Sequence, residues 1–98
     1  MKLTLTIVTA LIAMGALADK HKYCACDVDG KHNEKLSHDT CTRWGQTLPN
    51  TEWRGDKHAC HDYKSGGGID GLPWENTCKK VYQDQGRNPG AVRGKCHS

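Results

Sequence analysis

Large apolar side chains are scarce in this chain of 98 residues. It contains no phenylalanine, and no methionine follows Met14. From residue 19 onwards it has only seven valine, leucine or isoleucine residues: Val28, Leu36, Leu48, Ile69, Leu72, Val81 and Val92. At about 25 cal/mol per Å² of buried apolar surface, so small a set cannot offset the ordering entropy of about 80 residues. We therefore expect covalent cross-links to stabilise the fold.

A strong net charge and a long apolar run are missing as well. The formal net charge is +3, and the basic residues are scattered, which disfavours a dedicated nucleic-acid binder. The one apolar run, residues 3–13, is too short to cross a bilayer. It follows Met1-Lys2 and precedes Ala16-Leu17-Ala18, in the order of a secretory leader and its cleavage site. We predict a signal peptide over residues 1–18, a single secreted domain over residues 19–98, and no stable membrane insertion.

Cysteine, by contrast, is abundant after the predicted leader. An even number of cysteines in a short secreted chain indicates disulfides, here three. Cys24 and Cys26 are separated by one residue, and we expect them to reach different partners. A bond from one of them to Cys96 would tie the two ends of the domain together. The spacing leaves the remaining connectivity open among these residues: Cys24, Cys26, Cys41, Cys60, Cys78 and Cys96.

A zinc site is the alternative use of these cysteines. His58-Ala59-Cys60-His61 and Cys24-Ala25-Cys26 contain suitable ligands. The chain lacks a pair of C-x2-C motifs, and an oxidising secretory route consumes thiolates as disulfides. We therefore expect no metal and no other cofactor. The six histidines raise the positive charge of the molecule in acidic surroundings.

The remaining pattern predicts a small disulfide-stapled α+β domain, with one or two short helices packed on a small antiparallel sheet. A first helix is expected to begin at Glu34, after the capping residue Asn33, and to stop at Gly45. A second is expected to begin at Pro73 and to end at Gly86. Strands are predicted over residues 23–28, 51–54 and 57–63, and in a short segment that leads to Cys96.

Several short motifs resemble those of the small cysteine-rich secreted proteins of filamentous fungi, many of which act as effectors on plant hosts. The motifs are Tyr23-Cys24-Ala25-Cys26, Asp29-Gly30, Thr40-Cys41 and Gly94-Lys95-Cys96-His97-Ser98. The resemblance implies secretion and action by binding a host protein or a cell-wall glycan, with an effect on host defence. We expect a monomer that acts outside or inside host cells.

A second resemblance concerns the small fungal guanyl-specific ribonucleases. Val81-Tyr82 followed by Pro89-Gly90-Ala91-Val92-Arg93 is similar to a segment of that family, and His61-x-Tyr63 is similar to its His-x-Tyr strand. The resemblance implies that Arg93 would hold the transition-state phosphate and that His61 would act as a base or an electrostatic stabiliser. The family's glutamate has no aligned counterpart in this chain. Glu75 is the nearest carboxylate and is therefore the candidate for its role.

No complete catalytic set is present, so we favour a protein that is not an enzyme. A ribonuclease-like protein, active or catalytically dead, is one alternative, and nucleic acid would then be its partner. A cationic antimicrobial or membrane-active mini-protein is another.

Overall fold

The computed structural model describes residues 20–48, 50–63 and 67–97. The predicted signal peptide therefore lies outside the described residues. In chain order, the elements are β1 (Lys20–His21), β2 (Tyr23–Val28), β3 (Lys31–His32), α2 (Glu34–Gly45), β4 (Thr51–Arg54), β5 (Ala59–Asp62), β6 (Ile69–Asp70), α3 (Gly71–Asp84), the 3-10 turn η1 (Pro89–Ala91) and β7 (Val92–His97).

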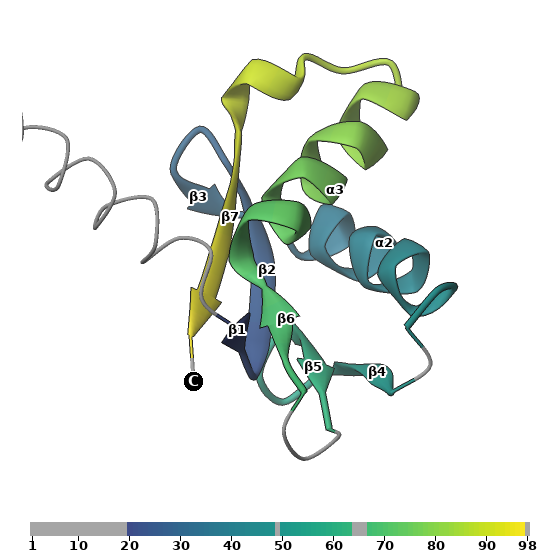
Figure 1. Ribbon diagram of the computed structural model, residues 1–98. Helices are drawn as coiled ribbons and strands as arrows, with labels where there is room; N and C mark the ends of the chain where they lie inside the picture. Colours follow the sequence, from purple (N-terminus) through teal and green to yellow (C-terminus); the bar gives the residue numbers. More distant parts are fainter. Residues whose placement is uncertain (1–19, 49, 64–66, 98) are drawn as a thin grey trace, which may run out of the picture.

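The main sheet is antiparallel and is organised around β2. β7 pairs with β2 along its whole length, from Tyr23 opposite His97 to Val28 opposite Val92. The other edge of β2 is shared, since β5 pairs with its first two residues and β3 with its last two. β4 pairs with β5 and extends the sheet, while β1 and β6 form a separate two-stranded sheet. The structure confirms the predicted α+β fold (Figure 1).

Helices α2 and α3 contact each other and the sheet (Figure 1). The predicted bounds of α2 are confirmed, and the Asn33 Oδ1 atom accepts a hydrogen bond from the Leu36 N–H at 2.9 Å. α3 begins two residues before Pro73, because a proline within the first turn removes no intrahelical hydrogen bond. It ends at Asp84, two residues before Gly86, whose φ of +81° terminates the helical path. None of the helices among the described residues is long and apolar enough to span a membrane.

The three expected disulfides are present, and Cys24 is bonded to Cys96 as one of the two expected arrangements. Cys26 bonds to Cys78 of α3, and Cys41 of α2 bonds to Cys60 of β5. Cys24 and Cys26 lie on the same, buried face of β2, as alternate residues of a strand do. Their partners differ because one lies on the neighbouring strand and the other on the helix above.

Half of the buried core consists of cysteine. Ten residues form this cluster, and five of them are disulfide-bonded: Cys24, Cys26, Leu36, Cys41, Cys60, Ile69, Trp74, Cys78, Val81 and Val92. Trp74 is completely buried, and its Nε1–H donates a 2.8 Å hydrogen bond to the Ala25 carbonyl oxygen. Trp74 also packs edge-on against Trp44, with ring centroids 5.6 Å apart. Sulfur bridges thus take the place that aliphatic side chains occupy in a larger domain.

Two of the strand predictions, residues 23–28 and 51–54, match β2 and β4. The strand expected over residues 57–63 is shorter, because the Lys57 and His58 N–H groups belong to a hydrogen-bonded turn after β4. His58 also has a positive φ of 52°, which a strand cannot continue. β1, β3 and β6, with two residues each, were not predicted.

Candidate functional site

The strongest candidate site lies on the face of the main sheet opposite the helices. Alternation along β2 turns Tyr23, Ala25 and Asp27 to this face, because the cysteines between them turn inward. The register then fixes which side chains lie beside them. His61 and His97 lie beside Tyr23, Lys95 beside Ala25, and Arg93 and His32 beside Asp27.

Three aromatic rings form a row across this face. The Tyr23 ring stacks on the His61 ring at a centroid distance of 4.8 Å and an interplanar angle of 19°. It stacks on the His97 ring at 5.4 Å and 25°. Because β5 and β7 lie on opposite edges of β2, the two imidazoles cover both faces of the phenol. The Lys57 Nζ atom lies 5.8 Å from the centroid of the same phenol.

Next to this row is an open pocket of about 280 Å³. The methyl groups of Ala25 and Ala59, both buried, form its floor. Every other lining residue is basic: His32, Lys57, His58, Lys95 and His97. Small floor residues leave the space open, and the polar groups of the side chains around it are ammonium groups and imidazole nitrogens. This combination of shape and charge is typical of an anion-binding site.

Two lysines, Lys57 and Lys95, are among the residues that line this pocket. Neither Lys57 nor Lys95 takes part in an ion pair among the described residues, although other surface cations do. Among the described residues, the acidic contact at the rim is that of the Glu34 carboxylate with the His58 Nδ1 atom. The two lysines therefore give the pocket a net positive charge.

A nearby ion pair leaves this charge unchanged. The Arg54 guanidinium donates two hydrogen bonds, each 3.0 Å long, to the Asp56 carboxylate in the turn between β4 and β5. The hydrogen bonds from Arg54 hold the pKa of the Asp56 carboxyl below its usual value. The pair stays internally neutral, so it neither adds to nor cancels the charge of the two lysines.

Two of the residues suggested by the ribonuclease resemblance lie on this sheet face, but far apart. His61 lies beside Tyr23, and Arg93 lies beside Asp27. Tyr23 and Asp27 are four positions apart along β2, which is about 13 Å at the rise of a β-strand. The Arg93 Nη1 atom also donates a 2.8 Å hydrogen bond to the carbonyl oxygen of its neighbour, Val92.

The third suggested residue, Glu75, lies on the helix side of the sheet. Its Oε1 atom accepts a 2.9 Å hydrogen bond from the Gly94 N–H of β7. A Cβ atom at Gly94 would lie only 2.9 Å from the Glu75 Cβ atom, so the glycine permits α3 to approach this closely. Glu75 therefore fastens α3 to β7, and the structure does not bring it together with His61 and Arg93.

Sequence reasoning did not assign the pocket residues, although one signal was present. The last strand reads Arg93-x-Lys95-x-His97, and this alternation predicts a basic face on β7. Lys57 and His58, by contrast, reach the pocket only through the turn that joins β4 to β5. Their contribution depends on tertiary structure and has no local signature.

All six cysteines are bonded in disulfides, so none of them offers a thiolate to a metal ion. Within the described part of the chain, no three or more His, Cys, Asp or Glu residues gather as a metal site requires. Comparison of the chain with models of protein families, with curated proteins and with solved structures gave no match. The shape and charge of the sheet face are therefore the basis of the functional proposal.

Proposed function

We propose that this protein is secreted and acts on a host by binding an acidic cell-wall polysaccharide in the basic pocket of the sheet face. One observation carries the proposal. Apart from its alanine floor, the pocket is lined only by lysine and histidine side chains, and its two lysines have no carboxylate partner among the described residues. A polymer of uronic acid residues presents regularly spaced carboxylates, which are the groups that these side chains bind.

The arrangement favours a polysaccharide over a single-stranded nucleic acid. Proteins that bind single strands stack the bases on free aromatic faces. Here both faces of the Tyr23 ring are already covered by His61 and His97. The row of rings is thus a wall beside the pocket, which leaves charge and hydrogen bonding as the means of recognition.

The same face is poorly suited to a large protein interface. Stable protein interfaces bury an apolar centre that is rich in aromatic side chains. The exposed large apolar residues of the described chain are Leu48, Tyr63 and Leu72, and none of them lines the pocket. A hydrated anionic polymer is the partner that matches an open pocket ringed by basic side chains.

Secretion is supported by the disulfides and by the amino-terminal sequence. Three disulfides in a domain this small are typical of oxidising compartments. The leader-like segment over residues 1–18 and the resemblance to small secreted fungal proteins point to the same location. The action on a host is inferred from that resemblance.

Binding to polygalacturonate tests the proposal, with a fully methyl-esterified pectin as the neutral control. We expect the wild-type protein to bind the acidic polymer and not the ester, and we expect added salt to weaken the complex. The double variant Lys57→Gln/Lys95→Gln should bind about tenfold more weakly, because two exposed charge contacts together contribute roughly 1.4 kcal/mol. The matched control, Lys79→Gln/Lys80→Gln on α3, removes the same charge elsewhere and should bind like the wild type.

Equal binding of the acidic and esterified polymers, or equal loss in both double variants, would contradict the proposal. Binding of an unstructured RNA with no binding of polygalacturonate would point instead to a nucleic-acid partner.

A further inference from the structure

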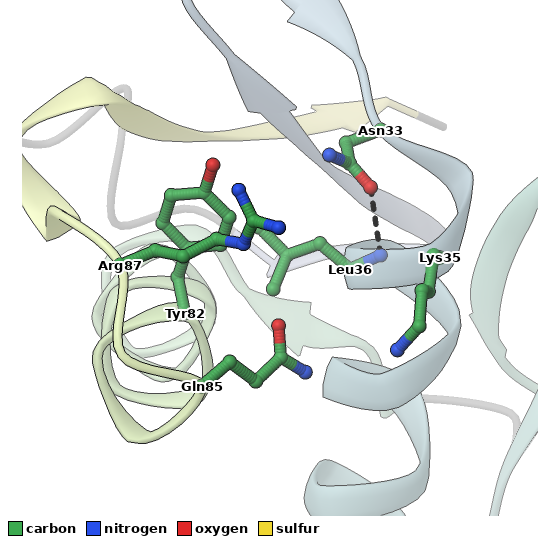
Figure 2. A pocket seen from close by; sticks show the side chains of 6 residues that line it. All are labelled: Asn33, Lys35, Leu36, Tyr82, Gln85 and Arg87. Atoms are coloured by element: carbon green, nitrogen blue, oxygen red, sulfur yellow. Dashed lines mark hydrogen bonds between the residues drawn. The ribbon is translucent and has the colours of Figure 1, made fainter.

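A second pocket, of about 410 Å³, lies between the helices and is not used by the proposed function. Its volume is within the range of pockets that hold small organic ligands. Figure 2 shows that its lining side chains converge from the start of α2 and from the end of α3 with the turn after it. They are Asn33, Lys35, Leu36, Tyr82, Gln85 and Arg87.

The end of α3 places an arginine at this pocket. Gly86 has a φ of +81°, and its N–H donates to the Gln83 carbonyl oxygen. The Arg87 N–H donates to the Tyr82 carbonyl oxygen at 3.1 Å, which completes a Schellman motif. This motif sets Arg87 back over the last turn of the helix, and its guanidinium carbon lies 5.9 Å from the centroid of the Tyr82 ring.

Two amide side chains hold fixed positions at the pocket. The Gln85 Nε2–H donates to the Asp39 carboxylate at 2.9 Å, so its oxygen remains available to a ligand. The Asn33 Oδ1 atom caps α2 through the Leu36 N–H, so its NH₂ group remains available. In Figure 2 the free oxygen of Gln85 points toward Leu36 and Arg87, and the free NH₂ group of Asn33 lies on the other side of these two side chains. A ligand hydroxyl would thus find an acceptor on one side of the pocket or a donor on the other.

The charges at the pocket are not balanced. Lys35 is paired with Asp39 at 2.8 Å. The hydrogen bond from Lys35 is the largest cause that keeps the pKa of the Asp39 carboxyl below its usual value, so the two charges cancel. Arg87 has no ion-pair partner among the described residues, and it lies over an aromatic ring beside the buried side chain of Leu36. One free guanidinium beside an apolar surface matches one carboxylate on a ring.

We infer that this pocket binds a small carboxylic acid whose carboxylate is attached to a ring. The carboxylate receives two hydrogen bonds from the Arg87 guanidinium, and the ring lies against Leu36 and Tyr82. A hydroxyl on the ring reaches the free end of Asn33 or that of Gln85. An aromatic acid and a single uronic acid share this chemistry, and they differ in the apolar character of the ring.

Chemical-shift titration of the isotopically labelled full domain tests this inference. The probes are 4-hydroxybenzoate, its neutral amide and free galacturonate. At least one acid should bind with a dissociation constant of about 1 mM, which is typical of so small a ligand, and should shift the amide signals around Tyr82 and Arg87. The neutral amide should bind at least tenfold more weakly, because it cannot form the charged contact.

The variant Arg87→Gln should lose binding of the acid by at least tenfold. The matched control Arg43→Gln removes an arginine that pairs with Asp84 outside the pocket and should leave binding unchanged. The inference is overturned if neither acid binds, if acid and amide bind equally, or if the shifts map elsewhere. The amide comparison uses only the wild-type protein, so it decides the question even if a variant fails to fold. Retained polygalacturonate binding by Arg87→Gln would show that the two sites are separate.

Discussion

Removal of the disulfides one at a time gives the most direct test of how this domain is stabilised. The bonds join residues 72, 52 and 19 positions apart in the sequence. If each bond closed a loop by itself, the chain-entropy relation would give about 4.4, 4.1 and 3.2 kcal/mol respectively. The loss on removal would then increase with the separation in the sequence.

The observed connectivity changes this expectation, because each bond is closed in the presence of the other two. With Cys26–Cys78 intact, the shortest covalent path from Cys24 to Cys96 has three parts. It runs two positions from Cys24 to Cys26, crosses the Cys26–Cys78 disulfide, and then runs eighteen positions from Cys78 to Cys96. The same path of about 20 residues connects Cys26 and Cys78 when Cys24–Cys96 is intact. For a loop of this length the relation gives about 3.3 kcal/mol, almost the value for Cys41–Cys60.

We therefore predict that the three double Cys→Ala variants lose nearly equal stability, about 3 kcal/mol each. The loss of packing is similar in the three variants, since each removes two sulfur atoms and only Cys96 is partly exposed. Unfolding by guanidinium chloride without added reductant, followed by tryptophan fluorescence, measures the free energy of unfolding while the two remaining disulfides stay closed. Losses that follow the sequence separation, with more than about 1 kcal/mol between the extremes, would refute the reasoning.

Three further changes should each affect stability in a defined direction. Trp74→Phe should lower the free energy of unfolding by about 1–3 kcal/mol, because the buried Ala25 carbonyl loses the hydrogen bond from the Trp74 ring. Chemical denaturation measures this loss, and an unchanged midpoint would contradict it. Gly94→Ala should lower the free energy of unfolding by a similar amount, about 1–3 kcal/mol, because the added Cβ atom would lie 2.9 Å from the Glu75 Cβ atom of α3. A melting temperature equal to that of the wild type would show instead that α3 can shift to make room. The pKa of the Asp39 carboxyl is lowered mainly by the hydrogen bond from Lys35, so its stabilisation is present above the unfolded value of 3.8 and is lost as the pH falls through the folded value. The acid loss of melting temperature should therefore be smaller in Asp39→Asn than in the wild type, and identical pH profiles would count against this pair.

Much of the local structure was predictable because it has local causes. The helix from Glu34 to Gly45 begins at a capping side chain that contacts its own first turn. The strand from Tyr23 to Val28 ends before the turn residues Asp29 and Gly30, which have positive φ angles of 53° and 78°. The count of three disulfides followed from composition and length. These features depend on residues a few positions apart, which the sequence presents directly.

The connectivity and both pockets depend on interactions between distant residues. The spacings after Cys26 are similar, so they did not distinguish among the possible partners. Lys57 and Lys95 meet only because β5 and β7 flank the same strand. The position of Glu75 against Gly94 likewise depends on how α3 docks. The motifs around His61 and Arg93, with Glu75 as the nearest carboxylate, therefore suggested a shared site that the folded chain does not form.

The bond between Cys24 and Cys96 has a mechanical consequence. Force applied to the two ends of the domain first pulls on β1, which pairs with β6, and beyond β1 it passes from Cys24 to Cys96 through a single covalent link. The helices and the rest of the sheet lie outside that load path. Tension between the two ends therefore does not unfold the core of the domain while this disulfide is intact. Reduction of the disulfide would allow the same tension to extend the chain.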